Sequence, residues 1–297
     1  MTAEIARTSA PVAGAQALLD EVEAHDGIAA FSEQFLAALD DPAREHTHLV
    51  AHEGEHLIGV ASCAPDGGVE LAVHPDFRRQ GVASGLIARI DDPSSKAFWA
   101  HGDLEAAQGL AAARGMEKTR ELLVMAIDAD ALEAGPVELP EGFAALNYTE
   151  ACERFGRDEV EQAWLDVNND AFSWHPEQGG WDLDRLHRGM AAEWFDPEGV
   201  WLLYDERRQA PVLAGFHWTK RHPGGTGEVY VVGLSSSYRG EGMGGPLMGV
   251  GLKHLVEGGS SQVILYVEAD NEPAVKRYNE IGFTIAESHV VYRNQVS

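Results

Sequence analysis

Two glycine-rich turns in this chain have the residue types of a phosphate-binding loop. The first is RRQGVAS at residues 78–84, and the second is RGEGMGG at residues 239–245. Each follows a run of β-branched apolar residues that predicts a strand, and each precedes an apolar pattern that predicts a helix. Glycine lets the backbone turn tightly without a Cβ in the way of a ligand. The N–H groups and dipole at a helix start favour negative charge, so the turns predict a site for a phosphate-bearing cofactor.

The sequence around the two turns follows one plan, which indicates an internal duplication of domain size. Residues 69–90 and 229–255 each predict a strand, a polar loop, the turn and a helix, and matched positions lie about 160 residues apart. Each stretch is followed by a strand and an alanine-bearing helix, in residues 98–116 and 265–283. With hairpin and helix patterns before each turn, this order predicts two copies of an α/β fold with a mixed sheet.

The length of the chain agrees with a duplication. Its 297 residues suit two domains of about 150 residues better than one core. Residues 128–143, DADALEAGPVELPEGF, are rich in acid, proline and glycine and predict a linker. We therefore expect an N-terminal domain at residues 1–135 and a C-terminal domain at residues 141–297.

Composition limits the partners and the location of the protein. The net charge of −26 argues against binding to nucleic acid or to an anionic membrane surface. No apolar run approaches the roughly 20 residues that span a bilayer, and the N-terminal residues lack the pattern of a secretory signal. The two cysteines, Cys63 and Cys152, do not indicate a disulfide framework. We expect a cytoplasmic monomer with no nucleic-acid or membrane partner.

One motif suggests a metal site, but its context argues against one. Residues 52–56, His-Glu-Gly-Glu-His, match the His-Glu-x-x-His pattern of zinc proteases. That chemistry needs a helix, so that both histidines share one face, whereas Gly54 lies between two strand-like runs. We therefore expect a hairpin at this position and no bound metal.

The turns resemble the acyl-CoA pyrophosphate loop of the GNAT superfamily of N-acetyltransferases, and the resemblance covers nearly the whole chain as two GNAT domains in tandem. Within that superfamily the C-terminal half resembles the mycothiol synthase family, in residues 168–181, 192–200, 215–223, 227–234 and 265–283. The resemblance implies an acetyl-CoA-dependent acyltransferase. Its acceptor would be the cysteinyl amine of desacetylmycothiol, a cysteinyl-glucosaminyl-inositol, and its products mycothiol and CoA. Two alternatives stay open: a tandem GNAT enzyme for another small amine, such as an aminoglycoside, and an acyl-CoA-binding sensor without catalysis.

Amine acetylation needs a base for the ammonium group, an acid for the leaving thiolate, and a site for the acetyl donor. The resemblance implies direct transfer, with Glu228 at the start of a strand as the base and Tyr278 in the last helix as the acid. A solvated glutamate and a core tyrosine are the alternative interpretations of these residues.

The resemblance also assigns the ligand contacts of the C-terminal half. The cofactor contacts lie on a strand end, on the turn and at the start of the last helix: Val232, Gly233, Leu234, Arg239, Gly240, Glu241, Gly242, Met243, Gly244, Gly245, Asn271, Glu272, Pro273, Ala274, Val275 and Lys276. The acceptor contacts are side chains with carboxylate, ammonium or phenol groups: Glu177, Lys220, Glu228 and Tyr266. Glu33 of the N-terminal half is expected to reach the acceptor as well, and a solvated glutamate on an amphipathic helix is the alternative interpretation of that residue.

The N-terminal half keeps the turn but lacks the catalytic pair. Counting back from matched positions places Gly67 where the other half has Glu228, and Ala111 where it has Tyr278. Glu70 is offset by an odd number of residues, which predicts that its side chain lies on the opposite sheet face. We expect this half to be non-catalytic and to be able to hold a second acetyl-CoA. The residues for that second site are those of its strand end and turn: Leu71, Ala72, Val73, Arg79, Gln80, Gly81, Val82, Ala83 and Ser84.

Overall fold

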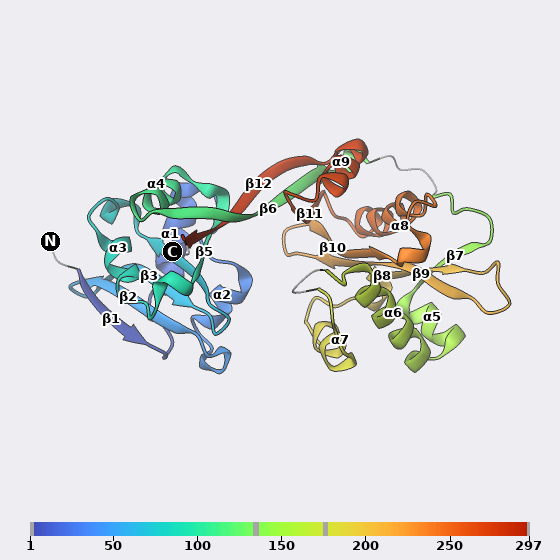
Figure 1. The fold of residues 1–297 in the computed structure, drawn as a ribbon, viewed down its shortest axis with the longest axis horizontal. Coiled ribbons are helices and arrows are strands. Elements are labelled where there is room, and N and C mark those ends of the chain that lie inside the picture. Colours follow the sequence, from blue (N-terminus) through green and yellow to red (C-terminus); the bar gives the residue numbers. More distant parts are fainter. Residues whose placement is uncertain (1–2, 133–136, 175–177, 296–297) are drawn as a thin grey trace. The chain divides into compact units, whose positions relative to one another are not determined.

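The computed structural model describes residues 3–132, 137–174 and 178–295. They form two compact units, each made of more than one stretch of the chain (Figure 1). Unit 1 comprises residues 1–124, 267–272 and 285–297, and unit 2 comprises residues 125–266 and 273–284. The division of the sequence into domains at residues 1–135 and 141–297 stays a prediction.

Unit 1 contains a mixed sheet. Its strands include β1 (Glu4–Thr8), β2 (Thr47–Glu53), β3 (His56–Cys63), β4 (Gly68–Val73), β5 (Ala97–Ala100) and most of β12 (Thr284–Asn294). The strands β1 to β4 pair antiparallel in sequence order. The strand β5 pairs parallel with β4 and antiparallel with β12, and β6 (Met116–Asp128) follows β12 in the strand order. The C-terminal strand therefore completes the sheet of the N-terminal copy.

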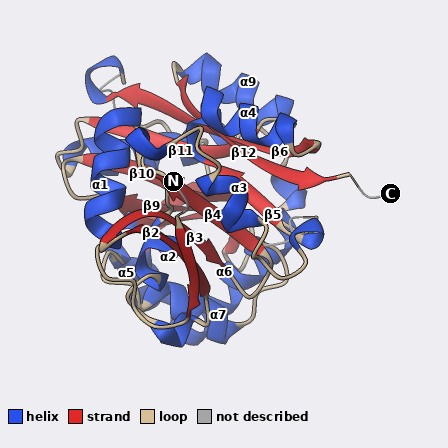
Figure 2. Cartoon of the chain, turned by 90° about the vertical axis from the view of Figure 1, so that its left-hand side faces the viewer, coloured by secondary structure: helices blue, strands red, loops and turns tan. Residues whose placement is uncertain are grey.

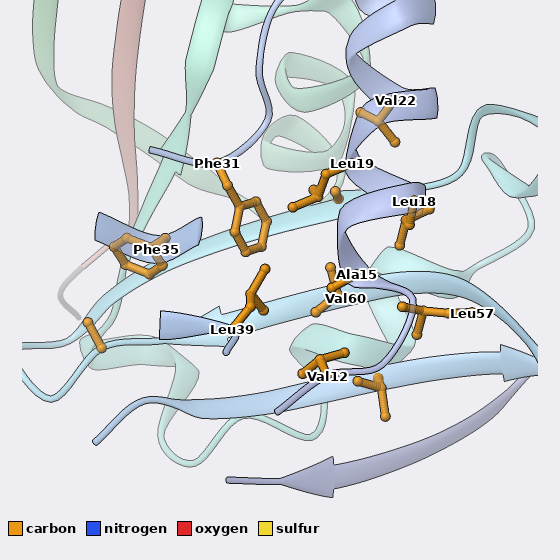
Figure 3. Packing of buried hydrophobic residues seen from close by; sticks show 13 residues of the cluster. Val12, Ala15, Leu18, Leu19, Val22, Phe31, Phe35, Leu39, Leu57 and Val60 are labelled. Carbon is orange, nitrogen blue, oxygen red and sulfur yellow. The ribbon is translucent and has the colours of Figure 1, made fainter. Parts of the chain in front are cut away.

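In the described part of unit 1, helices cover both faces of this sheet, and Figure 2 shows helices on both sides of the strands. They are α1 (Ala15–Asp26), α2 (Glu33–Ala38), α3 (Val82–Ile87) and α4 (Glu105–Ala113). Successive strand residues point to opposite faces. On one face, Leu18 of α1 and Phe35 of α2 pack in one core with Val60 of β3 (Figure 3). On the other face, Leu86 of α3 packs in a second core with Ala61.

Unit 2 repeats this plan. Its strands include β7 (Phe143–Asn147), β8 (Val200–Asp205), β9 (Val212–Arg221), β10 (Thr226–Leu234) and β11 (Gln262–Glu268). The strands β7 to β10 pair antiparallel, and β11 pairs parallel with β10. Its helices are α5 (Tyr148–Phe155), α6 (Arg157–Ala171), α7 (Leu183–Met190), α8 (Gly244–Glu257) and α9 (Glu272–Ile281). The predicted α/β fold with a mixed sheet, present twice, is confirmed.

The segment at residues 52–56 is a hairpin turn. Strand β2 ends at Glu53, Gly54 has a φ of +62°, and β3 begins at His56. The two histidines thus lie on different strands, without the helix that a zinc-protease motif needs. Within the described ranges, no group of three or more His, Cys, Asp or Glu side chains is arranged to hold a metal ion. In the same ranges, no helix has the length and apolar character to cross a membrane.

Candidate active site

The predicted phosphate turn of unit 2 lies between a short 3-10 helix (Ser236–Tyr238) and α8. Gly240 and Gly242 have φ values of +80° and +82°, in the left-handed region. A Cβ at either position would meet no atom within 4 Å, so backbone conformation rather than crowding requires glycine. The turn leads into the N-terminal end of a helix of 14 residues, where N–H groups favour an anion.

The structure adds one cation to this turn that the sequence did not indicate. Arg277 on α9 places Nη2 3.1 Å from the position that a Cβ would take at Gly245. Its Nη1 donates to Glu280 at 3.2 Å, which holds the guanidinium along the helix. The sequence assignment ended at Lys276 because it followed the motif at the start of the helix. A guanidinium beside a helix N-terminus is a suitable phosphate ligand.

Glu228, the predicted base, is a buried carboxylate between the imidazole of His222 and the ammonium group of Lys220. It is 5% exposed and lies on β10, directly opposite Lys220 of β9. His222 places Nε2 2.6 Å from Glu228 Oε2, and the Nζ atom of Lys220 lies 4.0 Å from the same oxygen. A solvated glutamate would not be enclosed in this way, so the structure disfavours that alternative for Glu228.

Aromatic rings enclose the same region of unit 2. Lys220 Nζ lies 5.2 Å from the centroid of the Trp194 ring, which packs edge-on against Tyr230 at 4.7 Å. Glu228 is also in register with Ile264 of β11. Tyr266 follows Ile264 by two residues, so it projects from the same sheet face as Glu228, and it is 46% exposed. Three of the five predicted acceptor contacts, Lys220, Glu228 and Tyr266, therefore share one face of one sheet.

The other two predicted acceptor contacts are not brought into this group. Glu177 lies outside the described residues. Glu33 is the first residue of α2 and belongs to unit 1. Their assignment to the acceptor site stays a prediction.

Tyr278, the predicted acid, is half-buried on α9. Its ring lies 6.1 Å from that of Phe283, and its carbonyl accepts a hydrogen bond from the Phe283 N–H. Burial raises the pKa of the Tyr278 phenol above its ordinary value of 10.0. The phenol therefore keeps its proton at neutral pH, which a proton donor to a thiolate requires. Both alternatives for Tyr278, acid and core residue, agree with this position.

Unit 1 contains a cavity of about 370 Å³ at the corresponding turn. Its walls come from α1, β4, the turn, α3, β5 and α4, and the α4 wall includes the small residues Ala107, Gly109 and Ala111. All but one of the residues predicted for the second acetyl-CoA site line it: Leu71, Ala72, Val73, Arg79, Gly81, Val82, Ala83 and Ser84. Gln80 is the exception, and its side chain instead donates to the Asp76 carbonyl at 2.9 Å.

The turn of unit 1 has the same backbone shape as that of unit 2. Arg79 and Gly81 have φ values of +63° and +86°, like Gly240 and Gly242. Arg79 thus adopts a left-handed conformation that side chains rarely take, which indicates that the fold imposes the shape. The preceding Arg78 is held by Asp26, to which it donates two hydrogen bonds at 2.8 and 2.7 Å.

The strand register corrects the sequence alignment of the two halves. Gly59 pairs with Val73, and Gly215 pairs with Leu234, so Val73 and Leu234 correspond. Strand β10 has a bulge between Val229 and Val231, whereas β4 pairs with β3 without a shift. The bulge adds one residue, so the counterpart of the predicted base is not Gly67, as counting suggested. It is Gly68, which pairs with Ala97 of β5 as Glu228 pairs with Ile264 of β11.

The same correction moves Glu70 to the other face. Glu70 is two residues from Gly68, so it projects from the face that carries Glu228 in unit 2, and the prediction of the opposite face was wrong. Its carboxylate is 2% exposed and accepts hydrogen bonds from Ser32 N at 2.8 Å, Ser32 Oγ at 2.9 Å and His101 Nε2 at 3.0 Å. Glu70 therefore lies on the same face as the counterpart of the base, two residues further along the strand, and its carboxylate has a structural role.

Both halves thus have the features of one fold: a strand paired over a few residues with its parallel neighbour, a turn with two left-handed residues, and a helix start. Sequence comparison agrees, because residues 161–283 match the model described as "Acetyltransferase (GNAT) family" and residues 44–118 the one described as "Acetyltransferase (GNAT) domain". The chain is a tandem GNAT acyltransferase.

Relatives of similar sequence show to which family of GNAT acyltransferases the chain belongs. The chain is 54% identical over 280 residues to the mycothiol acetyltransferase of Corynebacterium aurimucosum, covering 91% of this chain and 90% of that protein. It is 46% identical to the mycothiol acetyltransferase of Corynebacterium glutamicum, covering 93% and 91%. The chain belongs to the mycothiol acetyltransferase family.

Solved structures support the fold. An N-acetyltransferase of the same superfamily from Sphaerobacter thermophilus has a TM-score of 0.71 at 21% identity, covering 99% of this chain and 97% of that one. A tandem GNAT protein from the clavulanic acid biosynthesis pathway has a TM-score of 0.68 at 17% identity, covering 97% and 98%. Both matches extend over nearly the whole length of this chain and of the solved one.

Proposed function

We propose that this chain transfers the acetyl group of acetyl-CoA to the cysteinyl amine of desacetylmycothiol, giving mycothiol and CoA. The relatives named above are mycothiol acetyltransferases and match the chain over nearly its whole length. The observation that carries the proposal is the enclosed carboxylate of Glu228, on the strand that precedes the intact phosphate turn. An acid-base group on that strand is what acetylation of an ammonium group needs.

The residues of the C-terminal half fit the cofactor. The exposed turn at residues 239–245 and the helix start behind it suit a pyrophosphate, and Arg277 adds a positive charge beside them. The pantetheine arm would form hydrogen bonds with the backbone of residues 232–234. Residues 271–276 would line the other side of this arm. When bound, acetyl-CoA supplies the acetyl thioester.

In this mechanism Glu228 removes a proton from the cysteinyl ammonium, so that the amine attacks the thioester directly. Tyr278, protonated at neutral pH, gives its proton to the departing thiolate. The acceptor is held by the side chains of Lys220 and Tyr266 from unit 2, while the predicted roles of Glu33 and Glu177 in binding it stay predictions. Polyol and ammonium groups suit a set of carboxylate, ammonium and phenol partners.

The N-terminal half would bind a second acetyl-CoA without catalysis. The cavity of unit 1 supports binding, since nearly all of the predicted contact residues line it. Gly68 and Ala111 replace the base and the acid, which supports the absence of transfer. The cytoplasmic location and the monomeric state stay predictions.

Glu228→Gln and Tyr278→Phe test the catalytic roles. We expect each to lower turnover by roughly 10²–10⁴-fold while the fold is kept. Two matched controls should keep full turnover: Glu257→Gln, an exposed carboxylate on α8, and Tyr204→Phe, a core tyrosine of β8. Acetylated product is measured by mass spectrometry. A thiol reagent that detects released CoA would also react with the thiol of the acceptor. Wild-type turnover in both catalytic variants would refute the assigned roles.

A panel of acceptors tests the substrate. Desacetylmycothiol should be acetylated well above aminoglycosides and simple cysteine derivatives. If an aminoglycoside is the better acceptor, the chain is a tandem GNAT enzyme of different specificity. If no amine in the panel is acetylated although acetyl-CoA binds, the chain is an acyl-CoA sensor.

A further inference from the structure

Acetylation of an ammonium group leaves one proton over. The nitrogen loses two protons when it becomes an amide, and the CoA thiolate takes up one of them. The other must reach solvent before the next turnover, and in the proposed mechanism it first lies on Glu228. Glu228 as a whole residue is only 5% exposed, so the proton needs a carrier.

His222 has the position of such a carrier. Its Nε2 atom lies 2.6 Å from Glu228 Oε2, and its side chain is 20% exposed, against 7% for the side chain of Glu228. An imidazole can accept a proton on one nitrogen and release one from the other, and its ordinary pKa is close to neutral. His222 thus lies beside the enclosed carboxylate and is itself more exposed to solvent.

The hairpin fixes the histidine in this place. His222 directly follows β9, and its N–H donates to the Thr226 carbonyl at 2.8 Å across the turn. Gly224 and Gly225 in the same turn both have φ values of +89°, which only glycine adopts readily. The ring is therefore attached to a tight, well-defined turn.

Lys220 does not suit the same task. Its Nζ atom lies 4.0 Å from the same carboxylate oxygen, beyond hydrogen-bond distance. An ammonium group has no lone pair to accept a proton, and this one faces the Trp194 ring. Lys220 contributes positive charge beside the carboxylate.

We propose that His222 takes the proton from Glu228 after each transfer and passes it to solvent. This inference rests on the proposed role of Glu228 as the base. The proton moves from the substrate nitrogen to Glu228 Oε2, from there to His222 Nε2, and a proton leaves from Nδ1. His222 is a positioning and relay residue in this scheme, because it acts through Glu228.

The decisive variant is His222→Gln, whose amide can still donate a hydrogen bond to Glu228 but cannot carry a proton. In weakly buffered solution we expect turnover to fall at least about tenfold. Added imidazole should restore it in a saturable way, and the solvent deuterium isotope effect on turnover should rise. His187→Gln is the matched control, because His187 Nε2 lies 2.7 Å from another buried carboxylate, that of Glu161. It should keep turnover and not respond to imidazole.

Each outcome separates the relay from the base. If His222→Gln folds, as circular dichroism would show, and keeps wild-type turnover in weak buffer, the relay is refuted. A loss that imidazole does not relieve also refutes it and leaves His222 a structural role only. If either of these results is found for His222→Gln while Glu228→Gln loses activity, Glu228 is the base but His222 is not a proton relay. Full activity in Glu228→Gln rejects the base itself.

Discussion

The buried carboxylate of Glu70 gives the sharpest test of how unit 1 is held together. Its two oxygens accept three hydrogen bonds, from the backbone N–H and hydroxyl of Ser32 and from His101 Nε2. Hydrogen bonds to charged groups contribute about 1.5–3 kcal/mol each. In Glu70→Gln one oxygen remains an acceptor, while the new amide NH₂ faces donors. We therefore expect the free energy of unfolding to fall by about 3 kcal/mol, a large part of the ~5–15 kcal/mol typical of a protein.

Ser32→Ala provides the graded comparison. It removes only the hydroxyl bond, and the Ser32 hydroxyl makes no hydrogen bond that caps α2. The expected loss is about 1 kcal/mol. Urea unfolding followed by tryptophan fluorescence measures both variants, and Trp99, stacked on His101, reports from unit 1. Acetyl transfer in both folded variants should stay within about twofold of wild type. A Glu70→Gln protein as stable as wild type, or no more destabilised than Ser32→Ala, would refute the reasoning.

Two further predictions concern charged groups beside the turns. Arg277→Gln should raise the KM for acetyl-CoA about tenfold with little change in kcat, because one charge-assisted phosphate contact is lost. Initial rates at low and high salt give this KM, and an unchanged KM would show that Arg277 does not bind the cofactor. Burial alone would raise the pKa of Asp26, but the hydrogen bonds from Arg78 and His25, together with the positive charge of Arg78, outweigh burial and hold the pKa below the ordinary 3.8. This pair therefore stabilises unit 1 above pH 3.8, and the stabilisation is lost as the pH falls through the lower pKa of the folded state. Asp26→Asn should be less stable than wild type at about pH 5 in urea unfolding, and the difference should shrink in stronger acid; a difference that does not depend on pH would contradict the ion pair.

The duplicated fold could be predicted from the sequence because it depends on local patterns. Two turns with glycine at matched positions, each between a strand pattern and a helix pattern, indicated both copies. The structure confirms the matching down to the backbone, since Arg79 and Gly240 share a left-handed conformation. The sequence did not indicate Arg277, because its approach to Gly245 depends on how α9 packs beside α8 and not on spacing within a motif. Likewise, no pattern links His222 to Glu228, six residues away across a hairpin.

The alignment of the catalytic strand failed for one physical reason. Counting residues assumes that both strands advance one pair at a time, but Tyr230 lies in a bulge that opposes no additional residue of β9. Side chains alternate with a period of two, so a single extra residue reverses the predicted face of every position before it. Strand β4 has no bulge. Its face that corresponds to the Glu228 face of β10 carries Gly68 and the hydrogen-bonded Glu70. The two copies therefore differ in more than one substitution at the base: a return of catalysis to unit 1 would need a carboxylate at Gly68, a phenol at Ala111, and an inserted residue to reproduce the bulge.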